Sequence, residues 1–187
     1  VLAMPLAVND FFQFNFLLGN SNIVEEPPYR LSSNPEFWQE VQAYNLKSGQ
    51  TFVDAGAGIG VVSLILASSG LPLQIYMTEM NWVCLNLLEP QLESPPYKDN
   101  FNHLHLDTAE TRNLGLDPGL KADRILMREV FHHLNHQEEI LASVRNHLKE
   151  DGLLILVEAT RDLNVHNMAA CSKAMRLDKI LRILDAN

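Results

Sequence analysis

Basic residues and cysteines are scarce in this chain of 187 residues. It has 14 Lys and Arg against 23 Asp and Glu, which gives a formal net charge of -9, and it contains no run of basic residues. This deficit disfavours a protein whose main ligand is a phosphate backbone, so we expect no nucleic-acid partner. The two cysteines, Cys84 and Cys171, both lie in apolar helical patterns. We therefore predict two buried thiols rather than a disulfide.

Metal-binding patterns and membrane-spanning runs are lacking as well. The sequence has no Cys-x-x-Cys pair and no paired-His spacing on a predicted helix, so we expect no metal site. Residues 1–18 are rich in apolar side chains and carry one charge, Asp10. Asn9, Asp10, Gln13 and Asn15 interrupt the apolar run, which predicts no transmembrane span. No basic region opens the chain, and we expect a cytoplasmic protein, with a removed leader as the alternative.

The length and composition fit one globular domain with a substantial core. Hydrophobic residues make up 47% of the chain and charged residues 20%. We divide it into an N-terminal cap segment with a helix over 1–48, an α/β core over 49–160 and a C-terminal helix over 161–187. Within the cap, the Phe spacing over 8–18 fits either a helix or a strand, and we favour a helix that covers the ligand site.

Strand-like and helix-like segments alternate along the chain. A helix is predicted from Pro35, with Asn34 as its N-cap, to about residue 46, with Phe37, Val41 and Tyr44 on its buried face. The predicted strands are 51–54, 73–78, 101–106, 123–127 and 153–158. The predicted helices are 59–69, 82–88 (broken by Pro90), 135–152 (with an Asn135–Glu138 capping box) and 165–184. Such alternation predicts an α/β fold with a doubly wound, mostly parallel sheet.

A glycine-dense turn follows the first predicted strand. It has the pattern Asp54-x-Gly56-x-Gly58-x-Gly60 and leads directly into a helix. A strand, a glycine turn and a helix N-terminus together are typical of a site for a nucleotide-like ligand, because the backbone can approach the ligand closely. The dinucleotide fingerprint would place its third glycine at position 61, which is Val61. This difference, together with the lack of a Tyr-x-x-x-Lys pair, disfavours an NAD-dependent oxidoreductase.

Acidic residues stand at the ends of four predicted strands: Asp54, Glu79, Asp107 and Glu129. The carboxyl ends of parallel strands meet at one edge of a sheet, where ligands bind. Glu79 comes 23 residues after Gly56, close to the ~20-residue offset at which an acid binds the ribose hydroxyls in dinucleotide folds. We interpret it as a ligand for an unphosphorylated ribose; a solvated strand-end residue is the alternative.

These motifs resemble those of class I, Rossmann-like S-adenosylmethionine-dependent methyltransferases. Residues 54–60 resemble the cofactor loop of the family, and Glu79 matches its ribose-binding acid. Asp107-Thr108-Ala109 resembles the adenine-binding segment, and residues 123–134, which end in His132-His133-Leu134, resemble the fourth-strand motif of small-molecule methyltransferases. Residues 148–158 resemble the turn into the fifth strand, with Glu150-Asp151 in place of Pro-Gly.

The resemblance implies a methyltransferase that transfers a methyl group from S-adenosylmethionine to a small-molecule acceptor and releases S-adenosylhomocysteine. It implies these cofactor-binding residues: Asp54, Gly56, Gly58, Gly60, Glu79, Met80, Asp107, Thr108 and Arg128. Candidate bases are Glu129, His132 and His133, although either histidine could instead cap a helix or pack. Arg128 could also pair with Glu129. Met80 and Trp82 could flank the adenine, with Trp82 in the helix core as the alternative.

One departure from the family lies at the C-terminus. The family sheet usually continues past its fifth strand into an antiparallel hairpin, whereas residues 159–187 resemble a loop and a helix. The N-terminal segment or a second subunit, as in a homodimer, could cover the edge that this leaves open. Because this hairpin is not predicted, the alternative function is that of a non-catalytic methyltransferase-like domain that binds or assembles with a partner.

Overall fold

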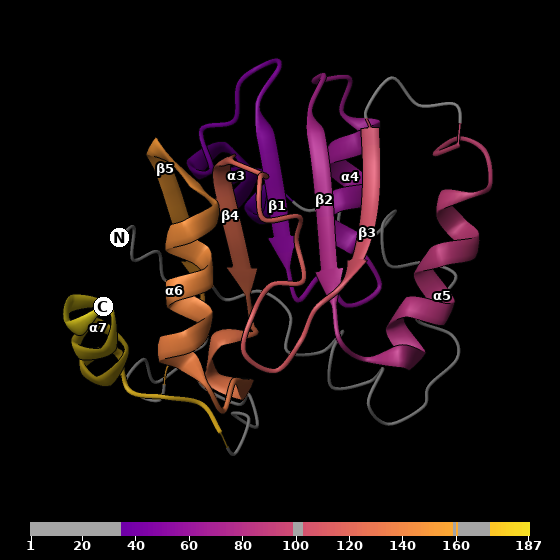
Figure 1. Ribbon diagram of the computed structural model, residues 1–187. Coiled ribbons are helices and arrows are strands. Elements are labelled where there is room, and N and C mark those ends of the chain that lie inside the picture. The colour runs from indigo at the N-terminus through magenta and orange to yellow at the C-terminus, as the bar shows by residue number, and fades with distance from the viewer. Residues whose placement is uncertain (1–34, 99–102, 159, 161–172) are drawn as a thin grey trace.

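Five parallel strands form one sheet with helices on both faces (Figure 1). The computed structural model describes residues 35–98, 103–158, 160 and 173–187. The strands are β1 (Thr51–Ala55), β2 (Gln74–Glu79), β3 (His103–Thr108), β4 (Ala122–Arg128) and β5 (Leu148–Val157), and their spatial order is β3-β2-β1-β4-β5. Each neighbouring pair is parallel. The doubly wound α/β fold predicted from the sequence is therefore confirmed.

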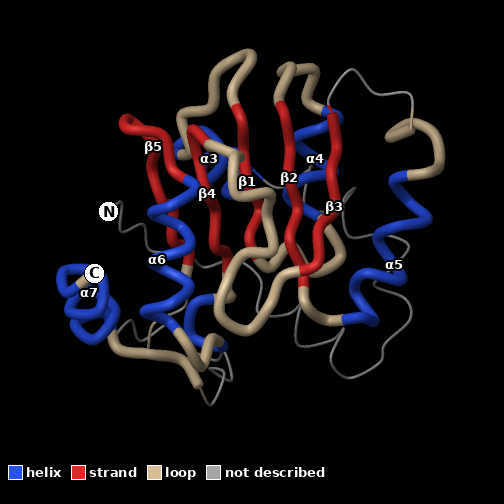
Figure 2. The backbone as a smooth tube through the Cα atoms, in the orientation of Figure 1, coloured by secondary structure: helices blue, strands red, loops and turns tan. Residues whose placement is uncertain are grey.

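The helices lie in two layers around this sheet. They are α3 (Pro35–Ala43), α4 (Val61–Ser68), α5 (Trp82–Leu92), α6 (Gln137–His147) and α7 (Leu177–Ala186). Figures 1 and 2 show α6 in front of the sheet and α3 and α4 behind it, with α7 beside α6. The described part of the chain contains no helix long and apolar enough to cross a membrane.

The central strands bury apolar side chains on both faces. In β1, Phe52 packs toward α3 and α4, whereas the next residue, Val53, packs toward α6; both are fully buried. In β4, Leu126 and its neighbours Ile125 and Met127 alternate in the same way. Successive strand residues point to opposite faces, so a sheet covered on both sides needs nearly continuous apolar strands.

Helix α3 buries the predicted face but ends earlier than predicted. Phe37 and Tyr44 are buried, at 0% and 2% exposure, and Val41 is half-buried. The helix stops at Ala43 because the backbone at Asn45 turns left-handed, with φ of 50°, which ends the helical hydrogen-bonding pattern. Asn34, the predicted N-cap, and the predicted helix over 8–18 both lie outside the described residues.

Two further helix predictions are corrected. Pro90 lies inside α5 and does not break it at residue 88. A proline removes one backbone donor, and this one stands in the last turn, where Gln91 Nε2 donates to the carbonyl of Leu87 at 2.8 Å. Helix α5 also buries Cys84, as predicted for that thiol, while Cys171 lies outside the described residues.

The predicted capping box of α6 does not form. His136, not Asn135, occupies the N-cap position, and its side chain makes no capping bond. The helix ends at His147, and β5 begins at once with Leu148. Ala122 of β4 pairs with Leu148 of β5, and Arg124 pairs with Leu153, so four residues of β5 (149–152) stand against one residue of β4, Asp123. The predicted turn is therefore an irregularity in the strand pairing.

The C-terminal helix is shorter than the predicted 165–184. Among the described residues it begins at Leu177, and residues 173–176 are not helical although Met175 is buried. The described residues after β5 add no strand to the sheet. On β5 itself, Leu153 is 53% exposed, so this strand is less covered than its apolar run predicted. Coverage of the β5 edge by a second subunit stays a prediction.

The connection between β3 and β4 depends on close backbone packing at Gly115. This residue has φ of +73°, and a Cβ there would stand 2.0 Å from the carbonyl oxygen of Thr108. Its N–H donates to the Asn113 side chain at 2.8 Å. The close approach folds residues 109–114 back against the end of β3.

Gly115→Ala is therefore expected to destabilise the fold more than Gly70→Ala does. Gly70 has a similar φ of +78°, and a methyl group added there would meet nothing within 4 Å, so only the conformational cost of about 1–2 kcal/mol applies. At Gly115 the clash adds roughly 1–3 kcal/mol of overpacking. Urea denaturation of both variants measures the difference; equal losses would contradict this account of the turn.

Candidate functional site

A cavity of about 360 Å³ opens at the carboxyl ends of β1, β2 and β4. Its lining comes from the glycine turn after β1, from the ends of the neighbouring strands and from the loops that follow β3 and β4. Titratable side chains among the lining residues are Asp54, Glu79, Cys84, Glu110, Arg128, Glu129 and His133. The parallel topology explains the location, because every crossover leaves the sheet at this edge.

Asp54 lies at the bottom of the glycine turn and is buried, with 3% exposure. Ser63 of α4 donates from Oγ to Asp54 Oδ2 at 2.7 Å. Burial is the main cause that raises the pKa of Asp54 from 3.8 to about 6, while the Ser63 hydrogen bond and Arg128 partly oppose it. A cationic ligand beside this carboxylate would favour its charged form and would be stabilised by it in turn.

The glycine turn is fixed by backbone contacts to β2. The N–H groups of Gly56 and Ala57 both donate to the carbonyl oxygen of Thr78, at 2.8 and 3.0 Å. A Cβ on Gly56 would meet Val130 Cγ2 at 2.6 Å, so this glycine allows the turn to pack on the segment after β4. Gly58 lines the cavity, whereas Gly60 lies at the N-cap of α4, outside the lining.

Glu79 holds the glycine turn as well as facing the cavity. Its Oε2 accepts from the N–H of Gly58 at 2.8 Å, and its Oε1 accepts from the N–H groups of Met80 and Asn81, both at 2.8 Å. A carboxylate offers about four lone-pair sites, so roughly one remains for a ligand hydroxyl, on Oε2. The same side chain thus links the turn after β1 to the end of β2 and to any ligand between them.

The predicted residues next to Glu79 and at the end of β3 occupy different environments. Met80 lines the cavity and is 53% exposed, while Trp82 is 70% exposed, so the interpretation of Trp82 as helix core is wrong. Asp107 and Thr108 do not line the cavity. Residues 109, 110, 113 and 114 do so instead, because the Gly115 turn folds them over the end of β3.

Arg128 is held by a residue that the sequence analysis did not identify, Glu40 of α3. The two Arg128–Glu40 contacts are 3.0 Å from Nε and 3.4 Å from Nη2. Tyr44 also donates a hydrogen bond to Glu40, and burial beside this carboxylate raises the pKa of Tyr44 well above its usual range. Glu40 itself is 1% exposed. Arg128 thus pairs with Glu40, a partner that was not predicted, and its pairing with Glu129 stays a prediction.

A signal for Glu40 was present in the sequence. It lies three residues after Phe37 and four before Tyr44, on the face of α3 that was predicted to be buried. An acid within an apolar helical stripe needs a buried partner, because an unpaired buried charge is costly. The partner comes from the end of β4, 88 residues further along the chain.

The segment after β4 presents Glu129 and His133 to the cavity. Glu129 has a left-handed backbone, with φ of 56°, and its N–H donates to the carbonyl oxygen of Val157 at 2.7 Å. The pKa of His133 is lowered below 6.5. Partial burial is the largest cause, and the charges of His132 and Lys173 lower it further. His133 is thereby kept neutral near pH 7 and able to accept a proton.

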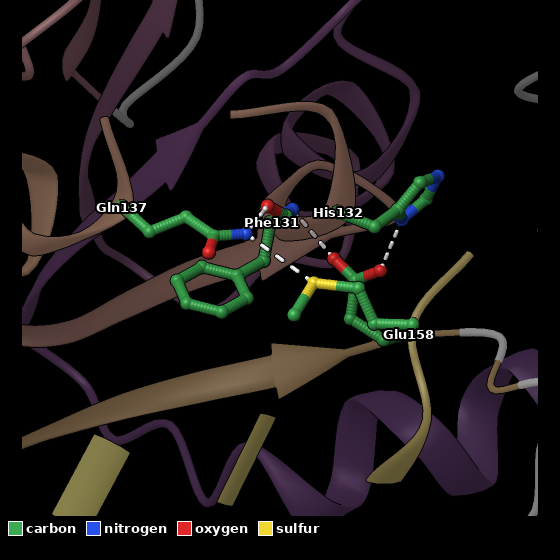
Figure 3. A network of polar contacts seen from close by, with 5 residues as sticks. Phe131, His132, Gln137 and Glu158 are labelled. Atoms are coloured by element: carbon green, nitrogen blue, oxygen red, sulfur yellow. Dashed lines mark hydrogen bonds and ion pairs between the residues drawn. The ribbon is translucent and has the colours of Figure 1, made fainter. Parts of the chain in front are cut away.

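His132 does not line this cavity, and its side chain takes part in a buried hydrogen-bond network (Figure 3). Its Nδ1 donates to Glu158 Oε2, and Glu158 Oε1 accepts from the N–H of Phe131 at 2.6 Å. One ligand atom from each of Glu129, His132 and Glu158 lies within 4.8 Å of the others, a spacing that a divalent cation could bridge. Glu158 was not among the predicted site residues.

The charge around the cavity is mainly negative. Four of the lining residues are acids: Asp54, Glu79, Glu110 and Glu129. The lining includes one arginine, Arg128, and its charge is paired with that of Glu40. Such a site favours a ligand that carries positive charge next to polar groups able to donate hydrogen bonds to carboxylates.

A family model described as a methyltransferase domain matches residues 29–183. The match covers most of the chain, and the chain belongs to this family of methyltransferase domains. Its glycine loop, strand order and fourth-strand segment are those of the Rossmann-like class I methyltransferases predicted from the sequence. None of the curated proteins compared with the chain matches it.

Solved structures share the fold at low sequence identity. An S-adenosylmethionine-dependent methyltransferase from Aquifex aeolicus is 17% identical, with a TM-score of 0.65 and coverage of 85% of this chain and 86% of that one. A precorrin-6y C5,15-methyltransferase from Geobacter metallireducens is 21% identical (TM-score 0.60; 84% and 73%). Coclaurine N-methyltransferase, bound to N-methylheliamine and S-adenosylhomocysteine, is 21% identical (TM-score 0.53; 63% and 33%), so this chain spans a third of that protein.

The burial of Asp54 predicts a specific pH dependence of stability. Its pKa is about 6 in the folded protein and 3.8 without burial, so its stabilising contribution is complete below pH 3.8 and is lost as pH rises through 6. The loss is about 3 kcal/mol. Relative to Asp54→Asn, the unfolding free energy of the wild type should fall by about this amount between pH 4 and pH 7. Urea denaturation across that range measures it; a difference that does not change with pH would contradict the prediction.

Proposed function

We propose that this protein is an S-adenosylmethionine-dependent methyltransferase that methylates a small-molecule acceptor. One observation carries the proposal: Asp54, the glycine turn and Glu79 face the same cavity, with Glu79 bonded to Gly58 across the two strands. Membership of the methyltransferase-domain family supports it. So do structural neighbours determined with S-adenosylmethionine, sinefungin or S-adenosylhomocysteine.

The residues around the cavity fit the parts of this cofactor. Glu79 would accept from a ribose hydroxyl through the free position on Oε2, and residues 109, 110, 113 and 114, which line the cavity beyond β3, would contact the adenine. Asp54 would stabilise the positive charge of the methionine part, and Arg128, already oriented by Glu40, would meet its carboxylate. The cofactor supplies a methyl group activated on a sulfonium. The acidic lining suits its cationic centre.

On the acceptor side we assign Glu129 and His133 as the candidate bases. Both line the cavity, close in the chain to Arg128, which would meet the methionine carboxylate. A hydroxyl or amine acceptor must lose a proton when it takes the methyl group, and a neutral imidazole of lowered pKa suits that role. Positioning of donor and acceptor supplies the rest of the acceleration, which can reach ~7–11 kcal/mol for well-aligned groups.

Isothermal titration calorimetry with S-adenosylmethionine, S-adenosylhomocysteine and NAD tests the cofactor assignment. We expect binding of the first two and none of NAD. Binding of the cofactor without methyl transfer to any acceptor in a panel of amines, phenols and carboxylic acids would favour the alternative of a non-catalytic binding domain. Folded protein that binds neither sulfur compound would exclude the enzyme.

Glu79→Ala should weaken S-adenosylmethionine binding by at least ~1–3 kcal/mol, because the ligand hydroxyls lose a charged acceptor. Glu79→Gln, which keeps one acceptor oxygen for the turn, separates the loss of charge from the loss of loop structure. Glu89→Ala, at an exposed position of helix α5 shortly after Glu79, is the matched control and should leave the affinity unchanged. Equal affinities of all four proteins would show that Glu79 does not bind the ribose.

A further inference from the structure

The two candidate bases stand on a segment with little regular structure of its own. Between β4 and α6 the chain forms only the short 3-10 helix η2 (Phe131–His133), and Glu129 before it has a left-handed backbone. Two local backbone bonds form within the turn: His133 N donates to Val130 O at 2.8 Å and Leu134 N to Phe131 O at 3.2 Å. The orientation of Glu129 and His133 therefore depends on contacts from outside the turn.

The backbone bond from Glu129 to Val157 is one such contact, and two side chains add others from opposite sides of Phe131 (Figure 3). Glu158, which directly follows β5, accepts from the Phe131 N–H at 2.6 Å, and Gln137 of α6 donates from Nε2 to the Phe131 carbonyl oxygen at 2.9 Å. Both polar backbone groups of Phe131 are thus used, while its ring is fully buried in the core. The turn is fixed at this residue.

Glu158 also fixes the ring of His132. The side chains of His132 and Glu158 are 3% and 4% exposed, and His132 Nδ1 donates to Glu158 Oε2. A carboxylate that accepts two bonds in a buried site makes stronger bonds than a neutral acceptor would, and its loss leaves buried donors without a partner. The imidazole of His132 in turn lies against that of His133, with ring centroids 4.1 Å apart.

We propose that Glu158 and His132 are positioning residues, which hold the turn so that Glu129 and His133 face the methyl acceptor. The pair does not itself touch the reacting groups, because His132 and Glu158 do not line the cavity. The contacts run from Glu158 to Phe131 and His132, and from His132 to His133. This inference rests on the proposed methyltransferase function and assigns to it two residues outside the cofactor motifs.

The charge of Glu158 also reaches His133. Among the influences on the pKa of His133, burial, His132 and Lys173 lower it and Glu158 raises it. Removing the charge of Glu158 is therefore expected to lower the pKa of His133 further. The acidic side of the pH–rate profile, where His133 must be neutral to act as a base, should then move to lower pH.

A divalent cation is the competing interpretation of the same residues. An ion bound by Glu129, His132 and Glu158 would replace the proton between His132 and Glu158. In that arrangement His132 would be a ligand and not a positioning residue. Chelation distinguishes the two, because a hydrogen-bonded pair needs no metal.

The experiment compares the wild type with Glu158→Gln, His132→Ala, His132→Asn and the double variant Glu158→Gln/His132→Ala. Glutamine keeps an oxygen for the Phe131 N–H but replaces the acceptor of the His132 proton with an amide. Asparagine at 132 keeps a nitrogen donor close to the place of Nδ1. Asp123→Asn is the matched control. Asp123 also accepts from one backbone N–H (Thr51, 2.8 Å) and one side chain (Lys149, 2.7 Å). It lies near the start of β4, at the end of the strand away from the cavity.

We expect Glu158→Gln and His132→Ala each to lower kcat by about 10- to 100-fold, the range for a small misplacement of reacting groups. The affinity for S-adenosylmethionine should stay unchanged, because neither residue faces the cofactor. The double variant should lose no more than either single variant, because both changes break one unit. His132→Asn should recover most of the rate, and Asp123→Asn should retain wild-type kcat.

Histidine NMR and amide exchange provide a readout that does not require turnover. In Glu158→Gln the pKa of His133 should fall and the Phe131 amide should exchange faster, whereas neither should change in Asp123→Asn. Wild-type values of both in Glu158→Gln would overturn the proposal. So would wild-type kcat in that variant, or activity that EDTA abolishes and a divalent metal restores.

Failure of the proposed function has a different signature. If the wild type binds no S-adenosylmethionine or methylates no acceptor, the assignment of the enzyme fails, while the NMR and exchange data still decide whether Glu158 holds the turn. If the wild type is active and the variants match it, the function stands and the positioning role is wrong.

Discussion

Parallel pairing of β1 with both β2 and β4 is the constraint on which the rest of this structure depends. It forces each connection to cross the sheet and return, so all strands end at one edge and the helices cover both faces. The glycine turn, Glu79 and the segment after β4 come from distant parts of the chain, yet they meet at this edge. The cavity is therefore a consequence of topology, and its chemistry is set by the side chains at the strand ends.

Buried carboxylates with fixed hydrogen-bond partners recur at this edge. Glu79 holds the glycine turn, Glu158 holds the turn after β4, and Glu40 orients Arg128 from α3. Burying a charge is costly unless hydrogen bonds or an opposite charge compensate it, so each of these acids is tied to a particular geometry. These hydrogen bonds hold the loops that line the cavity, which contain no long helix or strand.

The residues that sequence reasoning identified are those with local signals. The strand–helix alternation, the Asp54–Gly60 turn and the offset of Glu79 depend on backbone sterics and periodicity, and the structure places Asp54, Gly56, Gly58, Glu79, Arg128, Glu129 and His133 at one cavity. Helix ends were less predictable: Asn45 stops α3 through a left-handed backbone, Pro90 is accepted near the end of α5, and α6 begins without its capping box. Such boundaries are decided by packing of the neighbouring chain more than by propensity.

The sequence by itself determined the fold class, the glycine turn and the acids at the strand ends, because hydrophobic period and glycine spacing act over a few residues. Only the tertiary structure decided which partners these acids take. The Arg128–Glu40 pair joins residues 88 positions apart, and the Glu158–His132 pair joins residues 26 apart. Contacts of this kind depend on how the helices pack on the sheet, and no local pattern in the chain specifies that packing.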